Sequence, residues 1–151
     1  METKELLPVK QLNGVVHING AKNSVLLLLA AVALAEDQVV LSNVPEISDV
    51  GYMCLLLNQL NIKTTYVSSD TLLIDPSEAK YADLTGFECQ EVRTSILFLG
   101  AMLGRFGRAK IRSPGGCDLG KRPIDYHIQA MKMMGANIEH REELIIADSI
   151  N

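Results

Sequence analysis

The chain has 151 residues, of which 48% are hydrophobic and 21% are charged, proportions that are typical of a folded globular protein. This length is sufficient for one domain with a substantial hydrophobic core. The formal net charge of −4 argues against nucleic acid as the main partner.

Neither the most apolar stretch nor the first residues of the chain predict membrane insertion. Residues 25–35 are too few to cross a bilayer, and Glu36 and Asp37 end this stretch abruptly. The first residues, Met-Glu-Thr-Lys-Glu, are polar and acidic, unlike a secretory signal peptide. We therefore expect a cytoplasmic protein without a membrane partner.

The cysteines and histidines indicate neither disulfides nor a metal. Cys54, Cys89 and Cys117 are an odd number without paired spacing, which argues against a disulfide framework. Cys54 lies in an apolar helical run and is predicted to belong to the core, whereas Cys89 carries no clear signal. The histidines lack metal-ligand spacing, and we interpret His127 as structural. No metal or cofactor is expected.

The hydrophobic pattern predicts a series of short elements along the first half of the chain. A strand over residues 15–18 precedes a very apolar helix over residues 23–35, which Asn23 is expected to cap. After them come a strand, a turn containing proline, a second helix and two strands, at residues 39–42, 43–45, 48–60, 62–67 and 72–75.

The second half repeats this order of elements. Residues 93–105 align without gaps with residues 23–35, and residues 109–112 align with residues 39–42. A turn, a helix and two strands follow again, at residues 113–115, 124–134, 137–140 and 144–148. A repeat of this length indicates one supersecondary unit used more than once, with a shared core. We expect an N-terminal segment over 1–20, a first unit over 21–85 and a second over 86–151.

One loop, residues 114–123, has the composition of an anion site. It reads Pro-Gly-Gly-Cys-Asp-Leu-Gly-Lys-Arg-Pro. Its adjacent glycines let the backbone bend and approach a ligand closely. Lys121 and Arg122 favour the thiolate form of Cys117. The alternative is a glycine-rich connecting turn with a chance cysteine.

Two further cations lie near the starts of the apolar helices. Arg93 begins the second one, where its charge opposes the helix dipole, and Lys22 is one residue from the equivalent place in the first. An anion bound at these helix starts would explain the misfit, and a phosphate or carboxylate would suit. The alternative for Lys22 is an ordinary surface lysine. The basic residues between Arg105 and Arg112 are expected to form a solvated face.

Three motifs together resemble a known family. They are Gly20-Ala21-Lys22-Asn23, Arg93 at a helix start, and Pro-Gly-Gly-Cys-x-x-Gly-x-Arg-Pro-x-Asp over residues 114–125. They resemble the N-terminal part of the UDP-N-acetylglucosamine enolpyruvyl (1-carboxyvinyl) transferases, in the EPSP synthase-like superfamily. The related shikimate-pathway transferases share the fold but are not expected to carry the cysteine loop. The resemblance runs from about residue 14 to the end.

The resemblance implies both a fold and an activity. The fold is an α/β inside-out barrel of repeated βαβαββ-type units, with helices inside and small mixed sheets outside, incomplete here. The activity moves the enolpyruvyl group of phosphoenolpyruvate to the 3-hydroxyl of UDP-N-acetylglucosamine and releases phosphate. This is the first committed step of peptidoglycan synthesis, and the family is the target of fosfomycin.

The resemblance also implies roles for matching residues. Cys117 would donate a proton to the methylene carbon of phosphoenolpyruvate and could add to it covalently. Lys22 would be catalytic and, with Asn23, would contact phosphoenolpyruvate. Arg93 would bind the nucleotide sugar, and Arg122 would hold the phosphate or carboxylate. Arg122 and the four residues after it would line the uridine site: Pro123, Ile124, Asp125 and Tyr126.

The chain departs from the family in length. Members have two similar domains of three units each, with the active site between them. This sequence has two units, and it contains no counterpart of the general base or of a later arginine clamp. We therefore expect the chain to be inactive alone, and to form a homo-oligomer or to recruit a companion chain that supplies the missing domain. The alternative is a truncated, non-catalytic binding or assembly module.

Overall fold

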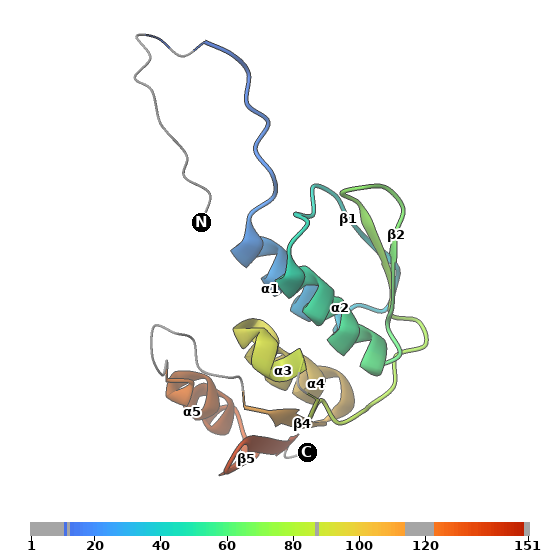
Figure 1. Cartoon of the computed structure of the whole chain (residues 1–151). Coiled ribbons are helices and arrows are strands. Elements are labelled where there is room, and N and C mark those ends of the chain that lie inside the picture. The colour runs from blue at the N-terminus through green and yellow to red at the C-terminus, as the bar shows by residue number, and fades with distance from the viewer. Residues whose placement is uncertain (1–10, 12, 87, 114–122, 150–151) are drawn as a thin grey trace.

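The computed structural model describes residues 11, 13–86, 88–113 and 123–149. Helices lie between two small sheets, as Figure 1 shows. The first half contains α1 (Lys22–Val32), β1 (Val39–Leu41), α2 (Ser48–Gln59), β2 (Lys63–Tyr66) and β3 (Leu72–Asp75). The second contains α3 (Glu88–Glu91), the 3₁₀ helix η1 (Arg93–Ile96), α4 (Leu97–Phe106), β4 (Arg108–Arg112), α5 (Asp125–Met133), β5 (Ala136–Arg141) and β6 (Leu144–Ser149).

The two sheets have the same strand order. It is β1-β3-β2 in the first sheet and β4-β6-β5 in the second, and every neighbouring pair of these strands is antiparallel. Because the last strand of each unit lies between the other two, the crossover helices α2 and α5 join strands that are parallel but not neighbours. The predicted mixed sheets are therefore antiparallel in their named strands. A parallel pairing occurs at the isolated bridge between Leu84 and Ile111.

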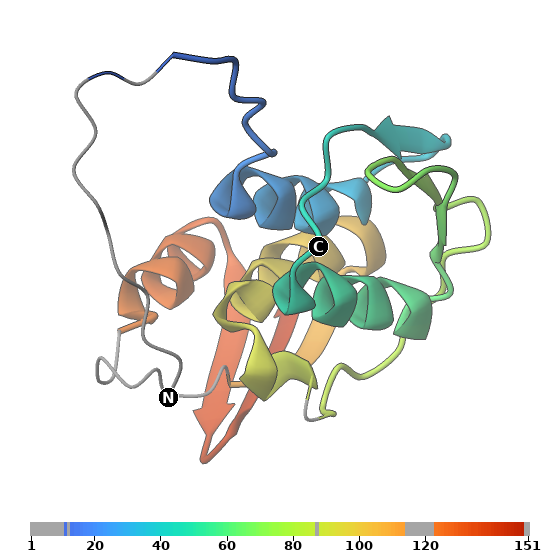
Figure 2. The ribbon, with the colours of Figure 1, turned by 45° about the horizontal axis from the view of Figure 1, so that its top comes forward.

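The core forms where helices from both halves meet. α1 contacts α2 and α4, and α4 lies against β4. Leu29, Met53 and Phe98 are fully buried there, one from each of these three helices. Burying such side chains contributes about 1.5–3 kcal/mol each relative to leaving them exposed. The prediction of an α/β fold with helices packed inside against sheets is confirmed. In Figure 2 the same helices are seen from a viewpoint rotated by 45°.

Two sequence predictions about the start of the chain are wrong. Residues 15–18 form no strand, because they pair with no other strand of the described chain, and Val15, Val16 and Ile18 are at least 84% exposed. Asn23 does not cap α1, because the helix begins at Lys22 and its N-cap is Ala21, so Asn23 already lies within the first turn. The prediction that Cys54 belongs to the core is met in part, since its side chain is half-buried and packs against the core.

A third prediction, that the basic residues from Arg105 to Arg112 form a solvated face, holds for the exposed Arg108 but is wrong for Arg105 and Arg112. The Arg105 guanidinium donates hydrogen bonds to the carbonyl oxygens of Ala33, Ala35 and Pro76 in the first half. The Arg112 guanidinium donates to the carbonyl oxygen of Thr85 at 2.9 Å. Arg105 reaches the first half because the end of α4 lies beside the segments that follow α1 and β3.

Candidate functional site

The first candidate residue, Lys22, begins α1 and forms an ion pair with the start of α2. Its Nζ lies 2.7 Å from Oδ1 of Asp49, which is in the first turn of α2. The lysine side chain is 54% exposed, whereas that of Asp49 is 23% exposed. The ammonium is therefore open to a dissolved anion while its partner is largely covered by protein.

The backbone before Lys22 is fixed by the turn between β1 and α2. The Gly20 amide donates a hydrogen bond to Oδ1 of Asn43 at 3.1 Å. A Cβ atom on residue 20 would lie 1.9 Å from the Asn43 carbonyl oxygen, so only glycine permits this approach. Asn43 has a φ of 56°, a left-handed conformation that asparagine tolerates better than most residues. This contact places the start of α1 beside α2.

Arg93 begins the 3₁₀ helix η1, which continues into α4. Its side chain is half-buried, and η1 contacts α1. The neighbouring Thr94 hydroxyl donates to Sδ of Met53 in α2 at 3.8 Å, and the Ser95 hydroxyl donates to the Cys89 carbonyl oxygen at 2.8 Å. The start of the second apolar helix is therefore fixed against the first unit.

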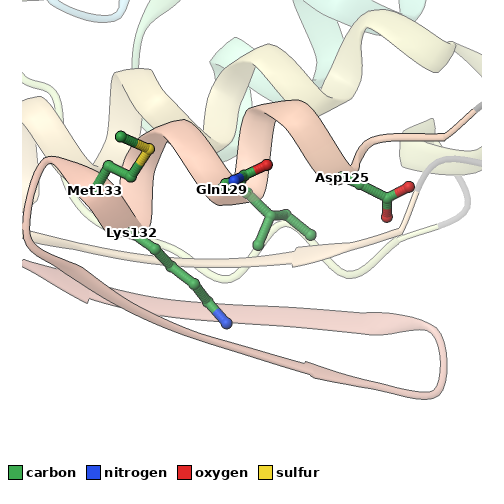
Figure 3. Close-up of a pocket in the computed structure, with 5 residues that line it drawn as sticks. Asp125, Gln129, Lys132 and Met133 are labelled. Atoms are coloured by element: carbon green, nitrogen blue, oxygen red, sulfur yellow. The ribbon is translucent and has the colours of Figure 1, made fainter.

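The remaining described candidates lie where α5 begins. Ile124 is the N-cap residue and packs against the core, whereas Pro123, Asp125 and Tyr126 are exposed. Asp125 is at one end of a hollow of about 450 Å³ along α5, shown in Figure 3. The other residues that line it are Ile128, Gln129, Lys132 and Met133.

The cysteine loop is described only at its two ends. Cys117, Lys121 and Arg122 lie outside the described residues. On the β4 side, the Ser113 amide donates to the Glu143 carbonyl oxygen at 2.6 Å, and an ion pair of 3.2 Å joins Arg112 to Glu143. The loop therefore leaves from the second sheet and returns at the start of α5.

Both described cysteines are poor candidates for proton transfer or nucleophilic attack. Cys89 is buried, its thiol donates to the Leu84 carbonyl oxygen at 3.1 Å, and burial raises its pKa to about 11. Burial also raises the pKa of Cys54, which a hydrogen bond with Thr64 partly offsets. Because the thiolate is the nucleophile, these two thiols are expected to react slowly at neutral pH.

Sequence reasoning missed two residues that hold the start of α1, namely Asp49, which pairs with Lys22, and Asn43, which accepts a hydrogen bond from the Gly20 amide. A signal for Asp49 was present, because both second helices of the repeat carry an acid in the first turn, Asp49 in α2 and Asp125 in α5. An acid there is stabilised by the helix dipole. The pairing of Asp49 with Lys22 depends on how α1 and α2 pack, which the local sequence does not encode.

The residues that the structure describes contain neither a cluster of metal-ligating side chains nor a helix that could span a membrane. Among them, no group of three or more histidine, cysteine, aspartate or glutamate side chains is placed to hold a metal ion. Within the same ranges, each helix is too short or too polar to cross a membrane.

Comparison with known proteins identifies the family of this two-unit α/β fold. Residues 6–150 match the model of the family described as EPSP synthase (3-phosphoshikimate 1-carboxyvinyltransferase). The chain belongs to this family.

Two curated relatives of this chain are named for the same enzyme. UDP-N-acetylglucosamine 1-carboxyvinyltransferase of Coprothermobacter proteolyticus is 44% identical over 138 residues, which are 91% of this chain and 32% of that protein. UDP-N-acetylglucosamine 1-carboxyvinyltransferase 1 of Staphylococcus haemolyticus is 42% identical over 144 residues, which are 93% of this chain and 34% of that protein. The chain therefore spans about a third of the length of these relatives.

A solved structure supports the fold. The enolpyruvyl transferase NikO from Streptomyces tendae matches with a TM-score of 0.76 over 91% of this chain and 30% of that chain. The sequence identity is 21%, so this likeness shows the shared fold alone.

Proposed function

We propose that this chain forms the cysteine-bearing part of an enzyme that transfers an enolpyruvyl group from phosphoenolpyruvate to the 3-hydroxyl of UDP-N-acetylglucosamine. The observation that carries the proposal is the 44% identity over 138 residues to a relative named for this reaction. The motifs at Gly20–Asn23 and at residues 114–125 lie within the family match.

The proposed chemistry is an addition followed by an elimination. The sugar hydroxyl oxygen bonds to C2 of phosphoenolpyruvate while Cys117 donates a proton to C3, and a base takes the hydroxyl proton. Cys117 must be a thiol in this step, so the bound anions would balance the charges of Lys121 and Arg122. Phosphate then leaves C2 as a proton leaves C3, which restores the double bond. Each step needs positioned proton-transfer groups and cations around the anionic substrate.

The chain supplies cations for this chemistry from several elements. Lys22, with Asn23, would contact phosphoenolpyruvate, because its ammonium is exposed at the start of α1. Arg93 and Arg122 would bind the sugar nucleotide and the phosphate or carboxylate. Pro123, Ile124, Asp125 and Tyr126 would line the uridine site, where the exposed Tyr126 ring and the hollow along α5 offer a binding surface.

The general base and the second arginine clamp would come from further units or from a companion chain. The exposed apolar surface supports such a partner, since Leu27 and Leu28 of α1 and Leu34, which follows that helix, are each at least 50% exposed. A second hollow, of about 250 Å³, lies between α4 and α5, and Met131 and Met134 are among the residues that line it. Monomers rarely expose large apolar patches. We place the assembled enzyme in the cytoplasm, in peptidoglycan and cell-wall synthesis.

A chimaera provides the test. This chain would replace the matching third of the Staphylococcus haemolyticus relative, and phosphate release would be measured with phosphoenolpyruvate and UDP-N-acetylglucosamine. We expect release that needs both substrates and that Cys117→Ser abolishes. The matched control is Cys54→Ser, which changes a half-buried thiol on α2 and should retain activity.

The isolated chain separates this proposal from the alternative of a non-catalytic binding or assembly module. We expect no turnover from the chain alone, because loss of a general base alone typically costs about 10²–10⁴-fold. A chimaera that folds and binds both substrates but releases no phosphate would favour the binding module. The partial coverage of the two relatives, 32% and 34% of their length, is the observation that keeps this second candidate.

A further inference from the structure

We propose that Asp49 and Asn43 are positioning residues for Lys22. Both lie in the segment from the end of β1 to the first turn of α2, and this segment holds the lysine where it can bind an anion. The proposal rests on the proposed function for the identity of that anion, phosphoenolpyruvate. The positioning itself rests on contacts made by this chain alone.

The first contact acts on the side chain. The Lys22 ammonium lies 2.7 Å from Asp49 Oδ1, across the interface between α1 and α2. A cation at the first position of α1 opposes that helix's dipole, whereas an acid in the first turn of α2 is stabilised by its own helix. Asp49 is thus held at the start of α2, and it holds Lys22 in turn.

The second contact acts on the backbone. The Asn43 side chain accepts a hydrogen bond from the Gly20 amide at 3.1 Å, two residues before Lys22. The Val44 amide, next in the chain, donates to the Asp70 carbonyl oxygen at 2.8 Å, which ties this turn to the loop between β2 and β3. The entry to α1 is therefore fixed to the same segment that supplies Asp49.

Lys22 and Asp49 differ in side-chain exposure, and this difference indicates a different role for each. Lys22 is 54% exposed and can be reached by a ligand, whereas Asp49, at 23%, is largely enclosed. Asp49 therefore keeps the flexible lysine side chain, which has several rotatable bonds, near one geometry before the anion arrives. Such preorganisation reduces the ordering cost of binding.

The test measures the reactivity of individual lysines in the full chain. Reductive methylation with formaldehyde and cyanoborohydride, followed by mass spectrometry, gives a rate at Lys22 and, as an internal standard, at exposed Lys63 of β2. Asp49→Asn should raise the rate at Lys22 about two- to five-fold, as expected for losing a partly exposed ion pair. The rate at Lys63 should stay unchanged, and Asp49→Glu should restore protection.

Two control variants separate the position of the Asp49 carboxylate from the loss of a negative charge, and the Asn43 side chain from its backbone conformation. Glu46→Gln removes the same charge from an exposed side chain in the same segment and should leave Lys22 unchanged. Asn43→Gly removes the side-chain acceptor while tolerating the left-handed backbone, and should raise the rate at Lys22. Asn61→Gly, which replaces another asparagine of positive φ, should leave the methylation rate at Lys22 unchanged. Equal effects of Asp49→Asn and Glu46→Gln, or no effect of Asp49→Asn, would overturn the proposal.

A second arm separates this proposal from the proposed function. Phosphoenolpyruvate, added to the wild-type chain, should protect Lys22 from methylation more than inorganic phosphate at the same ionic strength does. Lack of this protection would count against the proposed function. The response of Lys22 to Asp49→Asn would still decide whether Asp49 positions it.

Discussion

The guanidinium of Arg105 donates a hydrogen bond to the carbonyl oxygen of Ala33 at 3.2 Å, and so joins the last turn of α4 to the end of α1. The same group reaches Ala35 and, at 3.1 Å, Pro76. Carbonyl oxygens at a helix end have no partner within the helix. Arg105 therefore satisfies the carbonyl oxygen at the end of α1, together with two in the segments that follow α1 and β3, and connects the two halves of the molecule.

Replacing Arg105 should destabilise the fold. We expect Arg105→Met to lower the free energy of unfolding by about 2–3 kcal/mol, because hydrogen bonds to a charged donor are lost. Urea denaturation would measure the change. Arg141→Met is the control, since Arg141 is exposed on β5 and surface substitutions usually change stability by less than about 0.5 kcal/mol. Similar losses in both variants would contradict the role of Arg105.

Gly20→Ala should also destabilise the fold, and it should displace the start of α1. The new Cβ would lie 1.9 Å from the Asn43 carbonyl oxygen, and overpacking of this kind typically costs about 1–3 kcal/mol. Gly51→Ala offers the opposite control, because nothing lies within 4 Å of its Cβ and it is within α2. Alanine there should stabilise the protein by about 0.5–1 kcal/mol. Thermal denaturation of both variants checks the difference in sign.

The three cysteines should differ in reactivity, with Cys117 first, Cys54 second and Cys89 last. Burial raises the pKa values of Cys54 and Cys89, the latter to about 11, whereas Cys117 has Lys121 and Arg122 close in sequence. Limited treatment with iodoacetamide and mass spectrometry would give the order. Cys89 should be labelled only after denaturant is added. Preferential labelling of Cys54 would show that the order is wrong.

Stability should fall in acid partly through Asp75. Hydrogen bonds from Ser77 and Gln38 lower the pKa of Asp75 from 3.8 to about 2. A carboxyl whose folded pKa is depressed contributes stability above its unfolded pKa, and this contribution is lost as the pH falls from about 4 to about 2. Asp75→Asn should therefore flatten the stability curve in that interval. Asp37→Asn keeps Asp75 and its donors and gives the comparison curve.

The isolated chain should self-associate through its apolar surface. Leu28 of α1 and Leu34, which follows that helix, are 50% and 52% exposed, and association would cover them. Sedimentation over a concentration series should show a species larger than the monomer, and Leu28→Lys with Leu34→Lys should reduce it. The control Val40→Lys changes an exposed side chain of β1 and should leave the amount of the larger species unchanged. A monomer at high concentration without a dye-binding apolar patch would contradict this prediction.

The sequence by itself determined the element order and the motifs of the candidate site. Hydrophobic periodicity depends on neighbouring residues, and the gapless match of residues 23–35 to 93–105 shows the same pattern twice. The helices α1 and α4 and the strands β1 and β4 therefore lie close to their predicted positions. The boundaries of the units, and the roles of Cys117, Arg122 and the residues that follow it, stay predictions from sequence.

The tertiary structure alone decided how the two halves meet. The pairing of Lys22 with Asp49 needs the packing of α1 on α2, and the enclosure of Arg105 needs α4 to end beside α1. Residues 15–18 have strand-like composition but no neighbouring strand among the described residues, so they form no ladder there. Contacts between residues far apart in sequence depend on the whole packing arrangement, and local propensity carries no information about them.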